Sequence, residues 1–326
     1  AAGPWVDNLR EKDHSMNNKH LHLTKGVHIV FSRKRFPLTQ SIYFDVSDGR
    51  MIFAIPRGRA TYVGTTDTNY NGNLNRVVAT NVDASYLLDA TNNMFPSLNL
   101  KIEDIESNWA GLRPLIHEDG KDPSELSRKD EIFVSDTGLI SIAGGKLTGY
   151  RKMAQRVIDK VLNNVPEKKK VHLVKSYTEK IPLTTEPLEN TQAVNAYQKE
   201  IEKQLKDLNI TDTYQSWYLA TTYGKQANLI IDKMSFFLNE DPQECLIRSE
   251  LWYSIHHEMT NSLADFFVRR TGRLYFDIQS VHQYRPLVLE DMIKYLGWDE
   301  SRVHKENTYL DTLLTDAQQY YDEEFA

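Results

Sequence analysis

The sequence predicts an α+β protein whose first half forms an antiparallel sheet and whose second half is helical. In the first half, short runs of β-branched and aromatic residues are separated by Pro, Gly and Asp-Gly, the pattern of an antiparallel meander. In the second half, apolar residues recur three or four positions apart, as on the buried face of a helix. A chain of 326 residues is long enough for two cores.

The elements of the first half can be placed in order. Thr80 caps a helix that runs to about Met94, because Asp83 completes a capping box and Pro96 prevents continuation. An amphipathic helix is expected at 147–163, directly after a double-glycine turn. The expected strands are 26–31, 41–46, 50–56, 60–66, 102–116 and two strands within 131–144.

The second half is predicted to be a separate helical domain. Residues 166–187 carry three prolines and a lysine run, so we interpret them as a linker. This divides the chain into 1–165 and a helical domain at 188–326. Within the helical domain, Asp241 caps a helix whose first turn contains Pro242.

Composition excludes several classes of protein. The net charge is −6, and residues 166–326 hold most of the acidic excess, which argues against general nucleic-acid binding. No apolar run approaches the roughly 18 residues of a membrane-spanning helix. The single cysteine excludes an internal disulfide, and with no HExxH or CxxC spacing we expect no metal site. A chain that begins with alanine also suggests a piece of a longer protein.

The most suggestive motif is the stretch Gly144-Gly145-Lys146-Leu147-Thr148 between a strand and a helix. Glycines allow a backbone to approach a ligand, and the N–H groups at a helix start attract anions. Lys146 adds a charge and Thr148 a hydroxyl. The motif matches neither the Walker loop nor GxGxxG, so a purely structural turn and a ligand site are about equally compatible with it.

Other candidates are weaker when taken singly. His28 lies on a strand, where a histidine is more often structural than catalytic. Arg113 stands between apolar residues and would either pair with a carboxylate or bind an anion through its fork. Arg128 alone would be interpreted as surface, and residues 65–67 as a turn. The basic and aromatic stretch 31–37 is either a solvated hairpin loop or a contact for an anionic membrane.

Taken together, these segments are far more specific. The stretches "AAGPWVD", "KGVHIV", "YVGTTDT", "WAGLRPLI" and "GGKLTGYRKMA" occur in this order. They resemble the FAD-dependent glycerol-3-phosphate dehydrogenases of the respiratory chain. The resemblance covers residues 1–160 strongly and the helical remainder more loosely, through "RSELWYSIHHEMTNSLADFFVRRTGRL".

The resemblance implies a fold and a missing segment. It implies an antiparallel substrate domain, part of a Rossmann-like FAD domain, and an all-α C-terminal cap domain. The first piece of that FAD domain, which contains GxGxxG, is absent. We therefore expect the chain to be the C-terminal part of a longer protein, and the isolated chain to bind FAD weakly or not at all and to show no turnover.

The resemblance also implies a chemistry and a set of residues. Sn-glycerol 3-phosphate would be oxidised to dihydroxyacetone phosphate by hydride transfer to FAD. Arg113 and Arg128 match the positions that hold the substrate phosphate, and a further substrate arginine would lie in the missing part. His28 and Lys146 match substrate-site residues and are the alternative candidates for the base. The positions that match contacts to the cofactor are Gly3, Trp5, Gly111, Gly144, Gly145, Lys146, Leu147 and Thr148.

The electron acceptor follows from one further comparison within the resemblance. Related glycerophosphate oxidases, which make peroxide, often carry a long insertion after "LRPLI", whereas only ten residues separate Ile116 from Ser127 here. This favours transfer to a membrane quinone by a protein peripherally bound at the cytoplasmic face, possibly as a homodimer. The alternatives are a peroxide-forming oxidase, and a binding or regulatory module without redox chemistry.

Overall fold

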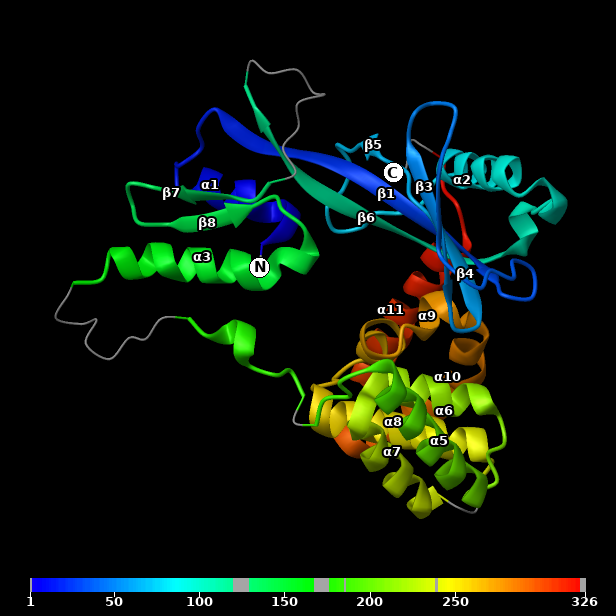
Figure 1. The fold of residues 1–326 in the computed structure, drawn as a ribbon. Coiled ribbons are helices and arrows are strands. Elements are labelled where there is room, and N and C mark those ends of the chain that lie inside the picture. The colour runs from blue at the N-terminus through cyan, green and yellow to red at the C-terminus, as the bar shows by residue number, and fades with distance from the viewer. Residues whose placement is uncertain (1, 120–128, 167–175, 185, 238–239, 323–326) are drawn as a thin grey trace.

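A computed structural model describes residues 2–119, 129–166, 176–184, 186–237 and 240–322. The polypeptide forms a long antiparallel sheet, a small layer of mixed structure at one end of it, and a helical body below (Figure 1). None of the described helices combines the length and the apolar content needed to cross a bilayer.

The main sheet has six strands in the order β2-β3-β4-β1-β5, with β6 paired to the other side of β1. Its strands are β1 (Lys19–Ser32), β2 (Ile42–Asp45), β3 (Met51–Arg57), β4 (Ala60–Gly64), β5 (Thr68–Asn69) and β6 (Ile105–Glu118). All of their pairings are antiparallel, as predicted. Only β2, β3 and β4 follow a meander, because β1 pairs with β4 and β6 and not with β2. β1 begins earlier than predicted, because residues 19–25 are mostly polar and are ordered by pairing with β6 rather than by strand propensity.

The pairing of β1 with β6 is the longest in the molecule. It runs from Lys19 opposite Glu118 to Phe31 opposite Ile105, with a single irregularity near Val30. In Figure 1 the two strands lie side by side and extend from the main sheet to the small layer at the opposite end. They therefore connect the two halves of this part of the structure.

One face of the main sheet is closed by α2 (Asn81–Met94). Val27, Ile29 and Phe31 point to this face and are fully buried in a core that includes Leu87 of the helix. The predicted capping box is confirmed, since the hydroxyl of Thr80 accepts from the Asp83 backbone N–H and the Asp83 carboxylate accepts from that of Thr80. Asp83 also forms a buried ion pair with Lys25 at 2.7 Å.

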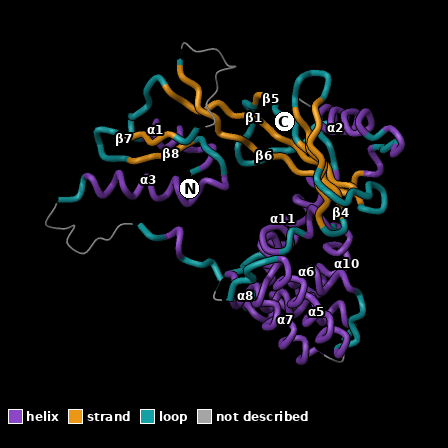
Figure 2. Tube along the Cα trace, in the orientation of Figure 1, coloured by secondary structure: helices purple, strands orange, loops and turns teal. Residues whose placement is uncertain are grey.

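The small layer packs against the far end of β1 and β6. It consists of α1 (Val6–Lys12), the hairpin of β7 (Glu131–Val134) and β8 (Ile140–Ala143), and α3 (Tyr150–Asn163). Its core is small, formed by Val6, Ile116 and Ala143 with Leu21 and Phe133. None of the α3 side chains is buried among the described residues, although the helix is strongly amphipathic. In Figure 2 this helix lies beside the hairpin of β7 and β8.

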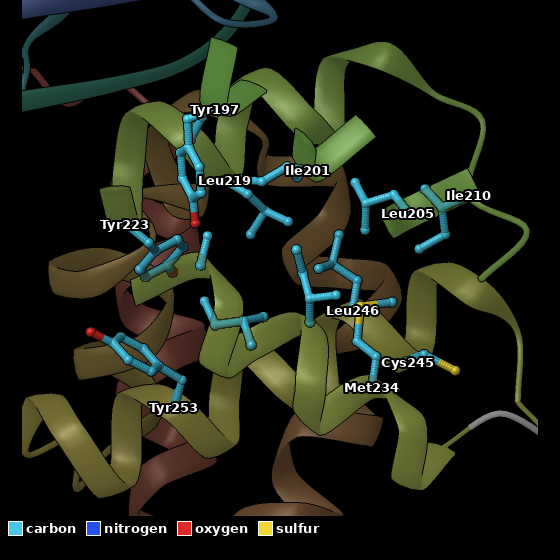
Figure 3. Packing of buried hydrophobic residues seen from close by; sticks show 14 residues of the cluster. Tyr197, Ile201, Leu205, Ile210, Leu219, Tyr223, Met234, Cys245, Leu246 and Tyr253 are labelled. Atoms are coloured by element: carbon cyan, nitrogen blue, oxygen red, sulfur yellow. The ribbon is translucent and has the colours of Figure 1, made fainter. Parts of the chain in front are cut away.

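The second half is helical, as predicted. Its elements are α5 (Thr191–Asp207), α6 (Thr213–Tyr223), α7 (Ala227–Met234), α8 (Pro242–Glu258), a π-helical segment (Asp265–Arg270), α9 (Arg273–Phe276), α10 (Ile278–Leu296) and α11 (Glu300–Gln318). Asp241 caps α8 by accepting from the Gln243 backbone N–H. Figure 3 shows one of its two cores, in which Tyr197, Ile201 and Leu219 converge between α5, α6 and their neighbours.

Hydrogen bonds from both sides of β6 join the helical half to the sheet. On one side of β6, the Ser107 hydroxyl donates to the carbonyl oxygen of Tyr275 in α9. On the other side, the Asn108 amide donates to Ala317 at the end of α11. After α11 the chain forms an isolated parallel bridge between Thr80 and Tyr321. Among the described residues this is the sole parallel pairing, so the Rossmann-like portion stays a prediction.

A buried ionic network holds α6, α8 and α9 together. Glu250 is fully buried and accepts hydrogen bonds from Tyr218, Tyr223 and, at 2.7 Å, the Arg273 guanidinium. Burial, followed by the charge of Glu250, raises the pKa of both tyrosines well above the usual value, so they remain protonated donors. The carboxylate on α8 therefore accepts from donors on two other helices, α6 and α9.

We expect Glu250→Gln to lower the free energy of unfolding by about 3–5 kcal/mol, because it leaves the Arg273 charge buried with its main counterion removed. The control is Glu202→Gln, which removes an exposed i,i+4 pair with Lys206 and should cost about 0.5 kcal/mol or less. Urea unfolding followed by far-UV circular dichroism measures both. Equal losses in the two variants would show that the network does not stabilise the helical half.

Candidate functional site

Two of the predicted substrate residues line one cavity. It has a volume of about 740 Å³ and lies between β6, the chain that follows β4, and the double-glycine turn. Arg113 from β6 and Lys146 from the turn both line it, together with Gly145 and Leu147. Residues from distant parts of the sequence are thus brought to one place, where Arg113 and Lys146 share a single space with a third cation, Arg50.

The guanidinium of Arg113 is held in a fixed orientation. Its Nη2 donates to the Thr65 hydroxyl at 2.9 Å, and its Nη1 donates to the Thr66 carbonyl at 3.2 Å and the Asp67 carboxylate at 3.3 Å. The turn that follows β4 therefore holds the guanidinium by hydrogen bonds on one side. A fixed, partly exposed guanidinium is suited to bind an oxyanion with its remaining donors.

Glycines leave space on the face of the sheet where Arg113 lies. Gly26 stands opposite Gly111 in the β1–β6 pairing. A Cβ at Gly26 would lie 2.4 Å from Nη2 of Arg113, so that any side chain there would displace the guanidinium. At Gly111 a Cβ would meet no atom within 4 Å, which leaves the backbone of β6 open. An exposed stretch of backbone of this kind fits a flat ring that approaches the sheet closely.

His28 lies one alternation along β1 from Gly26, on the same face. Its ring stacks on Trp109, with centres 4.6 Å apart and planes at 10°, and a Cβ at Gly64 would come within 2.2 Å of it. Burial, and secondly the charge of Arg113, lower the pKa of His28 from 6.5 to about 4. The imidazole is therefore neutral at neutral pH, and its buried Nδ1 has no hydrogen-bond partner among the described atoms.

The double-glycine turn has a structural reason of its own. Gly144 and Gly145 have φ values of +73° and +75°, which disfavour other residues. A Cβ at Gly144 would also lie 2.4 Å from the carbonyl oxygen of Lys129. The side chains beyond the turn remain open: Leu147 is 90% exposed, and the side chain of Lys146 makes no hydrogen bond or ion pair with the described part of the chain.

The helix after this turn begins later than expected. The sequence predicted its start at Leu147, but residues Leu147–Gly149 form a 3₁₀ turn and α3 begins at Tyr150. Glycine at position 149 weakens the α-helical conformation there. Thr148, predicted to contact the cofactor, therefore lies in the 3₁₀ turn and is exposed.

The remaining predicted site residues are not found among the described residues that line the cavity. Gly3 and Trp5 form a 3₁₀ turn that contacts β6, but neither lines the cavity. Arg128 lies outside the described residues. The sequence noted the polar turn at 65–67 without assigning it a role, and the structure shows that this turn orients Arg113. The signal was present in "GTTD", but its partner lies on a strand far along the chain.

Comparisons with known proteins identify relatives of this chain. Residues 1–151 match the family of FAD dependent oxidoreductases, and residues 135–303 match the C-terminal domain of alpha-glycerophosphate oxidase. The aerobic glycerol-3-phosphate dehydrogenase of Bacillus subtilis is 48% identical over 97% of this chain and 58% of that protein. The corresponding enzyme of Staphylococcus aureus is 42% identical over 98% of this chain and 57% of that protein.

A solved structure gives the same result. The crystal structure of the glycerol-3-phosphate dehydrogenase from Bacillus halodurans complexed with FAD superposes with a TM-score of 0.84 at 44% identity. The match covers 98% of this chain and 62% of that one. The chain thus spans somewhat more than half the length of the relatives that it matches. From the two family matches and these relatives, the chain belongs to the family of FAD-dependent glycerol-3-phosphate dehydrogenases.

Proposed function

We propose that this protein oxidises sn-glycerol 3-phosphate to dihydroxyacetone phosphate, and that the described chain supplies the substrate site. The observation that carries the proposal is the shared cavity of Arg113 and Lys146, two cations selected independently from separate motifs. A small phosphorylated substrate needs such a pair, because phosphate is bound strongly by an arginine fork and by a point charge at its other oxygens.

We assign a separate role in the reaction to each described residue of the site. Arg113, oriented by Thr65 and Asp67, binds the phosphate. His28 takes the hydroxyl proton at its imidazole nitrogen, since it is neutral at neutral pH and lies one alternation from the glycine beneath Arg113. Lys146 remains the alternative base.

The cofactor of this reaction is FAD, which when bound accepts the hydride from the carbon that carries the secondary hydroxyl. The open backbone at Gly111 and the exposed turn at Gly144–Thr148 fit a flat, anionic group. We propose that Gly3, Trp5 and Arg128 complete the cofactor and substrate contacts. We also propose that residues 1–165 combine the substrate domain with later pieces of a Rossmann-like FAD domain.

Membrane quinone is the proposed electron acceptor, with the protein bound peripherally at the cytoplasmic face and possibly dimeric. The short segment between Ile116 and Ser127 supports the dehydrogenase. The match to a domain described from alpha-glycerophosphate oxidase favours the second candidate, an enzyme that passes electrons to oxygen. The proposed boundaries remain a linker at 166–187 and a cap domain at 188–326.

We expect Arg113→Lys to raise KM for glycerol 3-phosphate about 10- to 100-fold with a smaller effect on kcat, because lysine lacks the planar fork. Dye reduction by the full-length protein at varied substrate concentration measures this. The control is Arg33→Lys, an exposed arginine in the turn after β1, which should stay within about twofold of wild type. An unchanged KM in Arg113→Lys would show that Arg113 does not bind the substrate phosphate in this cavity.

We expect the stability contribution of His28 to depend on pH. Its folded pKa of about 4 lies below the unfolded value of 6.5, so its contribution is complete above pH 6.5 and is lost as pH falls towards 4. At pH 5 wild type should therefore have lost roughly 1–2 kcal/mol relative to His28→Gln, compared with pH 7.5. Urea unfolding at both values measures the difference. Parallel losses in the two proteins would contradict the burial of a neutral imidazole.

The acceptor can be determined by measuring two products. With glycerol 3-phosphate in excess, we expect reduction of a soluble quinone analogue at least ten times faster than formation of hydrogen peroxide in air. The reason is that a dehydrogenase transfers electrons to quinone faster than its reduced flavin reacts with oxygen. Peroxide formation that matches substrate consumption, with quinone present, would establish the oxidase instead.

A further inference from the structure

The far end of the β1–β6 pair carries three side chains of metal-binding type. His20 on β1 stands directly opposite His117 on β6. Asp119 follows one residue after β6, and its backbone N–H donates to the Asn18 carbonyl at 2.8 Å, which continues the pairing by one step. His117 and Asp119 are two residues apart, so they project from the same face. One ligand atom from each of His20, His117 and Asp119 lies within 4.8 Å of the others.

The distances within this cluster suit a single ion. In tetrahedral coordination with bonds of about 2.0 Å, neighbouring ligand atoms are about 3.3 Å apart, and the centres of two bound imidazoles are about 5 Å apart. Nδ1 of His20 lies 3.3 Å from the Asp119 carboxylate. The His20 and His117 ring centres are 5.1 Å apart, with planes tilted by 57°. Two independent separations thus match the geometry before any ligand moves.

A neighbouring histidine lies outside the cluster. His22 is one alternation further along β1, and its ring centre is 6.5 Å from that of His117. Its Nε2 lies 2.8 Å from the Asn69 side-chain oxygen, so its ring is already held towards β5. His22 is therefore not part of the group whose ligand atoms lie within 4.8 Å of one another.

We propose that His20, His117 and Asp119 bind one divalent transition-metal ion, of which Zn²⁺ is the probe of choice. Two imidazoles and one carboxylate form a ligand set that zinc accepts, and water can complete the coordination because Asp119 is exposed. The ion would cross-link the end of β1 to the end of β6. These are the two strands that place His28 and Arg113, which lie further along the same face.

Local sequence spacing could not find this site. The HExxH and CxxC patterns place ligands within one short segment. Here the ligands are divided between residue 20 and residues 117–119, and the strand register alone brings them together. The expectation of no metal site rested on the absence of those local patterns.

The test is Zn²⁺ binding to the chelator-treated protein by isothermal titration calorimetry. We expect one ion per chain in wild type, at least tenfold weaker binding in His20→Gln and in His117→Gln, and wild-type binding in His22→Gln, the matched control. The thermal midpoint should rise with Zn²⁺ in wild type and in His22→Gln, and stay unchanged in His20→Gln.

Asp119→Asn provides a variant at an exposed position, which removes the carboxylate without disturbing the core, and it should also weaken binding at least tenfold. Far-UV circular dichroism verifies that each variant is folded before titration. The proposal is overturned if wild type binds no Zn²⁺, or if the two cluster histidine variants bind it as tightly as wild type. Loss of binding in His22→Gln equal to that in His20→Gln would overturn the assigned ligand set. Neither outcome depends on the oxidation of glycerol 3-phosphate, so the two proposals are tested separately.

Discussion

The register between β1 and β6 is the constraint on which the candidate site depends. The register places three pairs of residues opposite one another: His28 and Trp109, Gly26 and Gly111, and Thr24 and Arg113. Because side chains alternate along a strand, a slip of one residue would move Arg113 and Trp109 to the face that packs on α2. Buried side chains on that face, Val27, Ile29 and Phe31, oppose such a slip. The core on one face thus determines what the other face can bind.

On the open face, space and charge are arranged together. Gly26 leaves room for the guanidinium of Arg113, and the turn after β4 supplies the hydroxyl, carbonyl and carboxylate that hold it. The same positive charge, added to burial, keeps His28 neutral. One arginine therefore provides an anion-binding group and also helps to set the protonation state of its neighbour. Lys146, by contrast, reaches the cavity from an exposed turn.

Much of the fold was predictable because it follows from local patterns. The strands between Pro and Gly signals, the capping box at Thr80 and the helices of the second half all depend on residues close in sequence. Three features were not predictable for the opposite reason. The early start of β1, the grip of the 65–67 turn on Arg113, and the histidine pair at residues 20 and 117 all depend on contacts between distant segments. The late start of α3 is different, since the glycine at position 149 was visible but its effect was underestimated.

The return of the chain end to the sheet has a consequence for the order in which the molecule is made. Tyr321 donates a backbone hydrogen bond to Ala79 and accepts one from Asn81, and the segment just before it binds Asn108 of β6. During synthesis, β1 is made before its partner β6. The loop that leads into α2 is likewise made before the last residues of the described chain, to which it binds. Until those residues emerge from the ribosome, the edge of β6 and the start of α2 remain without these partners. The six strands of the main sheet lie within residues 19–118, but their contacts with the carboxyl-terminal segment form only after the described helices of the second half have been translated.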